Sequence, residues 1–161
     1  MSDGLPEHVE IARLAARSAR IQSVTPVSAM ARLVELLVDA TGSVDSDLRF
    51  SERQWIDGEA SARVRVICQR CLEPMAVAID VPIRLAVDAE LASLPDDREA
   101  VMSDDGRISL LALVEDELIL ALPIVPMHAE EKCIVRSVDK SAPAERESPF
   151  AVLQQLKNRP H

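Results

Sequence analysis

Two runs of alternating apolar residues, separated by a pair of cysteines, constrain this chain more than any other feature of its sequence. In residues 62–68 the even positions are apolar, and in residues 75–87 every odd position is apolar. Strict alternation over such lengths predicts half-buried strands, because successive side chains of a strand point to opposite faces of a sheet. The two runs therefore predict a β-hairpin that carries Cys68 and Cys71 on its turn.

The cysteine pair has two candidate partners downstream. Cys68 and Cys71 have the C-x-x-C spacing with which a tight turn points two thiolates at one metal ion. His128 and Cys133, in an H-x4-C spacing, can complete a tetrahedral set, and this assignment uses every cysteine of the chain. Because Zn²⁺ prefers closed sites of sulfur and nitrogen ligands, we predict that these four residues bind a structural zinc ion.

Two other interpretations of the cysteines stay open. The thiols can be reduced, half-buried and free of metal, as cysteines inside proteins often are. A thioredoxin-type redox pair is disfavoured, because such a pair opens a helix, whereas Glu73-Pro74 favours extended backbone directly after Cys71. A thiol- or zinc-responsive regulator, in which oxidation or metal release changes a partner contact, is the corresponding functional alternative.

More strands are predicted upstream of the hairpin. In residues 44–50, Val44, Ser46, Leu48 and Phe50 alternate with the charged residues Asp45, Asp47 and Arg49. Asp57-Gly58 predicts a two-residue hairpin turn, because Asp and especially Gly tolerate the positive φ that such turns need. Three antiparallel strands in sequence order follow from these signals. Pro82 cannot donate to a sheet ladder, so we expect the third strand to end, to bulge or to lie at an edge there.

Helices are predicted in three places. Residues 8–21 have an amphipathic pattern, and Thr25-Pro26 is a cap signal for a clearer amphipathic helix that continues to Gly42. Ser109 can cap a helix over residues 110–122 that Pro123 ends. Its apolar residues surround most of its circumference, which predicts a helix covered on nearly all sides at the centre of the core.

The predicted fold is α+β, an antiparallel β-meander packed against a few helices with the C-x-x-C at a hairpin tip. We expect one domain over residues 1–135, followed by a linker and a short helical tail in residues 136–161. Ser148-Pro149 opens this tail, whose apolar stripe precedes Lys157 and Arg159. The tail is expected either to dock on the domain or to bind a partner. The stripe consists of Phe150, Val152, Leu153 and Leu156.

The net charge of −9 is concentrated in one stretch. Residues 88–131 contain twelve acidic residues and only two basic ones, and residues 88–107 form an acidic connector. Direct phosphate binding by this stretch is disfavoured, because nucleic-acid affinity comes largely from Lys and Arg. A basic protein partner suits it better, although a solvated acidic loop without a partner is an equally good explanation. The candidate partner-binding acids are Asp96, Asp97, Asp104, Asp105, Glu115, Asp116 and Glu117.

Direct RNA contact remains a competing mode of action. The candidates for it lie on the polar side of the predicted sheet and its turn, and they are Arg63, Arg65, Arg70 and Arg84. Catalysis is not expected, because three adjacent acids at residues 115–117 without a paired base are typical of a solvated patch. No apolar run is long enough to span a membrane, and the amino terminus is acidic where a secretory signal needs basic residues, so we expect a cytoplasmic protein.

Several of these segments together resemble the bacterial YceD family. They are residues 44–47 (VDSD), 68–71 (CQRC), 110–123 (LLALVEDELILALP) followed by Val125, Pro126 and His128, and 149–153 (PFAVL). The segments occur in the family's order and cover most of the chain from Val44 onward. The resemblance implies a role in the accumulation of large-subunit (23S) ribosomal RNA, with no defined catalytic reaction. A ribosomal protein or the RNA itself would then be the partner.

Overall fold

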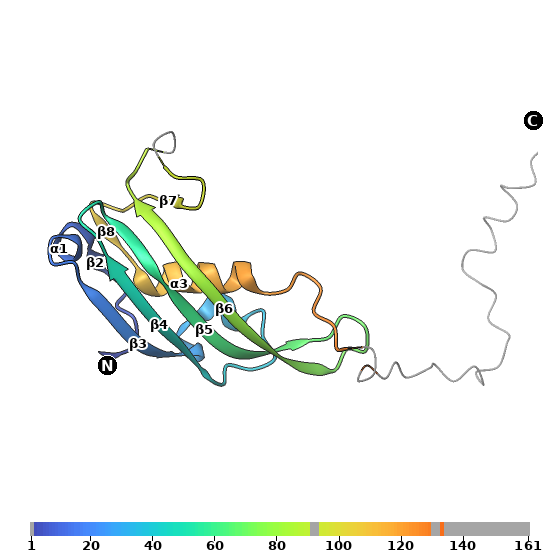
Figure 1. Ribbon diagram of the computed structural model, residues 1–161. Coiled ribbons are helices and arrows are strands. Elements are labelled where there is room, and N and C mark those ends of the chain that lie inside the picture. The colour runs from blue at the N-terminus through green and yellow to red at the C-terminus, as the bar shows by residue number, and fades with distance from the viewer. Residues whose placement is uncertain (1, 91–93, 130–132, 134–161) are drawn as a thin grey trace, which may run out of the picture.

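A computed structural model of the chain describes residues 2–90, 94–129 and 133. A long sheet has α3 and several helical turns on one of its faces, as Figure 1 shows. The elements are β1 (Ser2–Asp3), β2 (Val9–Glu10), α1 (Ile11–Ala15), β3 (Arg20–Pro26), η1 (Val27–Ala29, a 3-10 turn), α2 (Ala31–Val34), β4 (Ser43–Phe50), β5 (Trp55–Ile67), β6 (Pro74–Val87), β7 (Glu99–Val101), β8 (Arg107–Ile108) and α3 (Leu110–Ala121).

The predicted α+β fold with an antiparallel meander is confirmed. Strands β3, β4, β5 and β6 are neighbours in sequence order and pair antiparallel, while β1 and β7 join the two edges in parallel. A separate two-stranded sheet pairs β2 with β8. The expected alternation holds in β4, because Val44, Leu48 and Phe50 are buried whereas Asp45 and Arg49 are exposed.

The long strands β5 and β6 pair from Trp55 opposite Ala86 to Ile67 opposite Pro74, and the C-x-x-C turn joins them as predicted. Strand β4 accompanies β5 only as far as Ala62, so the hairpin extends past the rest of the sheet and forms a tip. Pro82 lies within β6 opposite Glu59. Strand β7 pairs with β6 only at residues 85–87, so Pro82 occupies an edge, one of the places predicted for it.

The predicted hairpin turn at Asp57-Gly58 is wrong. Both residues lie inside β5, and the connection from β4 to β5 is made by residues 51–54. The backbone oxygen of Ser51 accepts a hydrogen bond from the backbone N–H of Gln54. Gln54 has a φ of 58° and is the left-handed residue of this turn. Gly58 is needed for a different reason, because a Cβ at this position would lie 2.1 Å from the backbone oxygen of Asp47 in β4.

The two amino-terminal helix predictions are also corrected. Only Ile11–Ala15 is helical within residues 8–21, and β3 continues to Pro26 where a helix cap was expected. The hydroxyl of Thr25 is buried and accepts a hydrogen bond from the backbone of Leu5. The segment after Pro26 forms the 3-10 turn η1 and the single α-turn α2, which together bury the next apolar side chains.

Helix α3 begins and ends where the sequence predicts. The Ser109 hydroxyl accepts a hydrogen bond from the backbone of Ala112, and the helix ends at Ala121 before Pro123. Only one side of the helix is covered, however. Leu110, Val114 and Leu118 are fully buried against the sheet, whereas Leu120 is 75% exposed. The prediction of a helix covered on nearly all sides is therefore wrong.

The acidic connector is not structureless within its described residues, since it contains β7 and the start of β8. The predicted linker and tail lie outside the described residues, so the domain boundaries stay a prediction. Among the described residues, no helix is long and apolar enough to cross a membrane.

Candidate metal centre

The turn between β5 and β6 positions the first two candidate ligands. Cys68 is fully buried at the end of the alternating run, and its backbone pairs with Glu73 and Leu72 across the turn. Leu72 adopts a φ of 61°, which reverses the chain before Pro74 starts β6. The sulfurs of Cys68 and Cys71 are thereby held on the same side of a closed turn.

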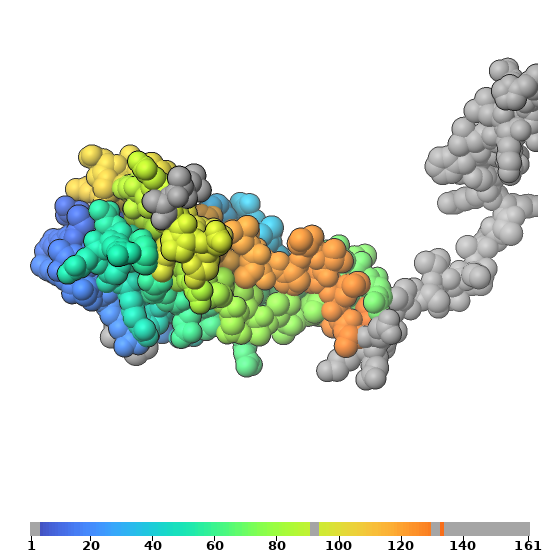
Figure 2. Space-filling model, turned by 45° about the horizontal axis from the view of Figure 1, so that its top comes forward, coloured from blue at the N-terminus to red at the C-terminus, as the bar shows by residue number. Residues whose placement is uncertain are grey.

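The extended segment after α3 brings the other two ligands to the same turn. Figure 2 shows this orange segment running along the molecule to the green hairpin tip. The backbone oxygen of Pro126 accepts a hydrogen bond of 2.8 Å from the backbone of Gln69. The backbone N–H of His128 donates a hydrogen bond to Cys68 Sγ at 3.4 Å. Two hydrogen bonds therefore connect the segment after α3 to the hairpin turn.

The four candidate ligand atoms have the spacing of a tetrahedral site. All lie within 4.8 Å of one another. The sulfurs of Cys68 and Cys133 are 3.8 Å apart, and Cys71 Sγ is 3.3 Å from His128 Nδ1. A tetrahedron with ordinary zinc–ligand bonds has sulfur–sulfur edges of about 3.8 Å and sulfur–nitrogen edges of about 3.6 Å. These two distances are close to the edges of a tetrahedral site, so the four residues could hold a four-coordinate metal ion.

The charge at the cluster also suits a cation. Burial raises the pKa of the Cys68 thiol, but backbone N–H groups of Cys71, His128 and Arg70 act against burial, and the net effect lowers this pKa. Burial and the neighbouring cysteines raise the pKa of Cys133. Backbone N–H groups thus stabilise the Cys68 thiolate. Ionisation of Cys133 next to it is unfavourable, and a bound cation would remove that penalty.

A disulfide does not explain the arrangement. All three cysteines are free thiols, and the Cys68–Cys133 sulfur separation of 3.8 Å far exceeds a covalent sulfur–sulfur bond of about 2.05 Å. The structure brings together the four residues that the sequence pattern selected, Cys68, Cys71, His128 and Cys133.

The predicted acidic partner site is divided by the fold. Asp96, Asp104 and Asp105 are exposed, and Asp97 is exposed but pairs with Arg84 at 2.8 Å. The side chain of Glu115 is only 7% exposed, in contrast to the solvated patch expected for residues 115–117. Its neighbours on the same helix, Asp116 and Glu117, remain accessible to solvent.

Arg32 is a structural partner of Glu115 that the sequence did not reveal. Glu115 Oε1 accepts hydrogen bonds from the backbone of Arg32 and Leu33, at 2.7 and 3.0 Å. The Arg32 guanidinium binds Glu115 Oε2 and also pairs with Asp116. No local sequence signal links residues more than eighty positions apart.

The four candidate RNA-binding arginines are exposed but differ in their partners. Arg65 pairs with Asp39 at 2.9 Å, and Arg84 pairs with Asp97. Arg70 contacts the sulfur of Met127 at 3.8 Å, next to the metal centre. Arg63, on β5, has no ion-pair partner among the described residues.

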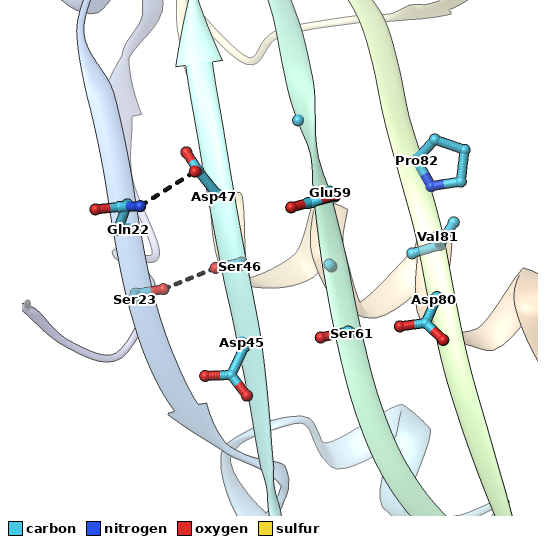
Figure 3. A pocket seen from close by; sticks show the side chains of 12 residues that line it. Gln22, Ser23, Asp45, Ser46, Asp47, Glu59, Ser61, Asp80, Val81 and Pro82 are labelled. Atoms are coloured by element: carbon cyan, nitrogen blue, oxygen red, sulfur yellow. Dashed lines mark hydrogen bonds between the residues drawn. The ribbon is translucent and has the colours of Figure 1, made fainter.

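The open face of the sheet carries a hollow of about 600 Å³ between β3 and β6. Its side chains are shown in Figure 3, where Gln22 donates to Asp47 and the hydroxyls of Ser23 and Ser46 are joined. The hollow itself is acidic and therefore unfavourable for phosphate groups. The acids around the hollow are Asp45, Asp47, Glu59 and Asp80.

Comparison with known proteins agrees with the resemblance seen in the sequence. The family described as "Large ribosomal RNA subunit accumulation protein YceD" matches residues 56–157. A protein of that name from Haemophilus influenzae is 32% identical over 147 residues, which cover 80% of this chain and 84% of the relative. No solved structure matches the chain.

Proposed function

The chain belongs to the YceD family, and we propose that it is a non-catalytic cytoplasmic factor needed for the accumulation of large-subunit (23S) ribosomal RNA. Membership of the family is the observation that carries this proposal, because the matching relative is named for that role. The candidate metal centre supports the non-catalytic part. Four protein ligands would fill a tetrahedral shell and would leave no position for a water or substrate molecule, as in structural zinc sites.

The proposed role is tested by complementation. In a bacterial strain whose own YceD-family gene is deleted, we expect the ratio of 23S to 16S ribosomal RNA to fall about twofold or more. Expression of this chain should restore the ratio, measured by RNA electrophoresis and quantitative hybridisation. An unchanged ratio in the deletion strain, or no rescue by a stably expressed chain, would contradict the proposal.

We further propose that the metal is zinc and that it fastens residues 123–133 to the hairpin tip. The support is the match of the sulfur and nitrogen spacings to a tetrahedral zinc site, together with the lowered pKa of Cys68. Zinc binding to such sites has an apparent free energy on the order of 10 kcal/mol at neutral pH. Binding would thus hold in place a segment whose side chains Ile124, Val125 and Met127 are exposed.

Metal analysis of the purified full chain tests the zinc proposal. We expect about one zinc ion per chain in the wild type, and a loss of at least tenfold in zinc affinity for Cys71→Ser. The matched control is Gln69→Ala, in the same turn, because the Gln69 side chain is exposed and only its backbone contacts Pro126. Equal zinc content in the wild type, Cys71→Ser and Gln69→Ala would show that Cys71 is not a zinc ligand and would contradict the four-residue site.

A basic ribosomal protein fits the structure better than RNA as the direct partner. Two of the four candidate arginines already pair with aspartates, and the hollow in the open face of the sheet is lined by four acids. Asp96, Asp104 and Asp105 instead project from the connector without an ion pair among the described residues. Complementary charge of this kind mainly increases the rate and specificity of association with a basic surface.

Two charge-reversal variants distinguish the partners. The protein-partner proposal predicts that Asp96→Lys, Asp104→Lys, Asp105→Lys together abolish co-purification with ribosomal proteins, whereas Arg63→Glu, Arg70→Glu together do not. Ultraviolet crosslinking to RNA provides the second measurement. If only the arginine variant loses both co-purification and RNA crosslinking, the result would support RNA contact and contradict the protein-partner proposal.

The thiol arrangement also favours a second candidate function, a thiol- or zinc-responsive regulator. The sulfurs of Cys68 and Cys133 lie 3.8 Å apart, close enough for a peroxide to convert the two thiols to a disulfide and water with release of the metal. If this is the function, peroxide treatment should remove two titratable thiols and change partner binding reversibly. Partner binding that is identical before and after complete oxidation would exclude the regulator.

A further inference from the structure

A groove of about 760 Å³ lies between α3 and the strands at the connector end of the sheet. Its floor is apolar and includes Val101, Ile108 and Leu113. Met102 and Leu120 stand at its margins with 76% and 75% of their surface exposed. Large apolar side chains exposed together beside a concave surface typically mark a place where another segment binds.

The rim of the groove is acidic. Glu99, Asp104, Asp116 and Glu117 line it, against Arg107 and His8 as the basic residues. Partial burial, together with the charges of Glu99 and Asp116, raises the pKa of the Glu117 carboxyl. Asp116 already pairs with Arg32, but Glu99 and Glu117 repel one another and would be stabilised by a cationic group bound between them. The groove therefore fits an apolar segment that also carries positive charge.

The carboxyl-terminal sequence of the same chain has this chemistry. From Pro149 to His161 it contains Lys157 and Arg159 and no acidic residue. In a helix starting at Pro149, the side chains of Phe150, Leu153 and Leu156 fall on one side, because positions three and four apart are neighbours on a helix. We propose that residues 149–157 dock into the groove over α3, with their basic end against its acidic rim.

The linker is long enough for this docking. Leu120 and Cys133 are thirteen residues apart, so their Cα atoms can be separated by at most about 45 Å. Phe150 follows Cys133 by seventeen residues, which can span about 60 Å. The length of chain after Cys133 therefore suffices for the tail to reach Leu120.

The covalent connection also favours the chain's own tail over a separate partner. A tethered segment experiences an effective concentration in the millimolar range. An amphipathic helix with an intrinsic dissociation constant of about 10–100 µM would then occupy the groove about 90–99% of the time. This estimate requires neither the metal centre nor a ribosomal partner, so the inference is independent of the proposed function.

Hydrogen exchange of the full-length protein tests the proposal. We expect backbone amides of residues 150–157 to exchange about tenfold to a hundredfold more slowly than in an unstructured peptide of the same sequence. Leu120→Asp in the groove and Leu153→Asp in the tail should each abolish this protection. Leu72→Asp is the matched control, because Leu72 is 70% exposed but lies at the hairpin turn, and it should leave the protection unchanged.

Three results of the hydrogen-exchange experiment would overturn the proposal. One is unprotected tail amides in the wild type, and another is protection that survives Leu120→Asp while circular dichroism shows an intact fold. The third is protection that increases with protein concentration, which would mean that a second copy supplies the tail. A synthetic peptide of residues 148–161 added to the Leu153→Asp variant is the second measurement, and failure to bind at millimolar concentration would also contradict docking.

Discussion

Glu115 shows how one side chain can change role between sequence and structure. Among three adjacent acids it is typical of a solvated patch, and we predicted it as part of a partner surface. In the structure its carboxylate binds the first backbone N–H groups of α2 and the Arg32 guanidinium. A side chain from α3 thereby supplies the cap that the sequence before α2 does not provide.

We expect Glu115→Gln to lower the free energy of unfolding by about 2 kcal/mol, because a nearly buried set of charge-assisted hydrogen bonds is weakened while Arg32 keeps only Asp116. Urea denaturation at neutral pH measures this loss. Glu117→Gln, on the same helix, is the control and should change the free energy of unfolding by less than about 0.5 kcal/mol. Equal losses in the two variants would show that the contact with α2 is unimportant.

A second residue-scale prediction concerns pH. The Arg20 guanidinium binds both carboxylate oxygens of Asp47. These hydrogen bonds, together with one from Gln22, outweigh the effect of partial burial and lower the pKa of Asp47 to about 2. Because the folded-state pKa lies below the ordinary value of about 3.8, the pair stabilises the fold above that value. This stability is lost as the pH falls from about 4 to about 2.

Arg20→Ala should therefore lower the free energy of unfolding at pH 7, and its difference from the wild type should disappear near pH 2. Urea denaturation between pH 2 and pH 7 measures this difference. Arg17→Ala is a suitable control, because Arg17 is exposed and makes no ion pair among the described residues. A difference that is constant with pH would contradict the assignment.

At the scale of elements, β5 determines how its neighbours end. Beyond Ala62 this strand has no partner from β4, and the backbone oxygen of Arg65 accepts a hydrogen bond from Val38. The segment that was predicted to be helical to Gly42 therefore attaches to the projecting strand after one helical turn. The apolar spacing correctly predicted which side chains are buried, since Val27, Met30 and Leu33 are fully buried. It did not predict the secondary structure, because a 3-10 turn followed by a short helix buries the same side chains as one long helix would.

Gly58 gives the corresponding prediction for the sheet. Because the atom that an added Cβ would meet at 2.1 Å belongs to the backbone of β4, Gly58→Ala must separate two paired strands. We expect a loss of about 3 kcal/mol in the free energy of unfolding, measured by urea denaturation. Gly106→Ala has no neighbour within 4 Å and only the strain of its φ of 73°, so it should lose about 1 kcal/mol. Similar losses would refute the close approach.

At the scale of the whole molecule, the tip and the core are held by different forces. The core is a continuous cluster of aliphatic side chains between the sheet and α3, whereas the tip contains the four candidate ligands. Metal removal should consequently open the tip and leave the core folded, because hydrophobic burial does not depend on the ion.

Chelation at neutral pH, followed by hydrogen exchange, measures this division. We expect exchange at residues 66–75 and 123–128 to increase at least tenfold, while the amides of β4 and the paired centre of β5 remain protected. A chelator already saturated with zinc is the control. No change at the tip would contradict metal binding, and equal loss of protection in tip and core would contradict the separation of the two regions.

The sequence by itself determined the meander, the hairpin with its cysteine turn, the bounds of α3 and the four residues that cluster as candidate metal ligands. Periodicity, capping residues and the small number of cysteines are local or countable properties. Only the tertiary structure decided where the β4–β5 turn lies, how residues 27–42 fold, and that Glu115 binds Arg32. Those outcomes depend on contacts between backbone and side-chain groups that lie tens of residues apart in the sequence, and no local sequence pattern predicts such contacts.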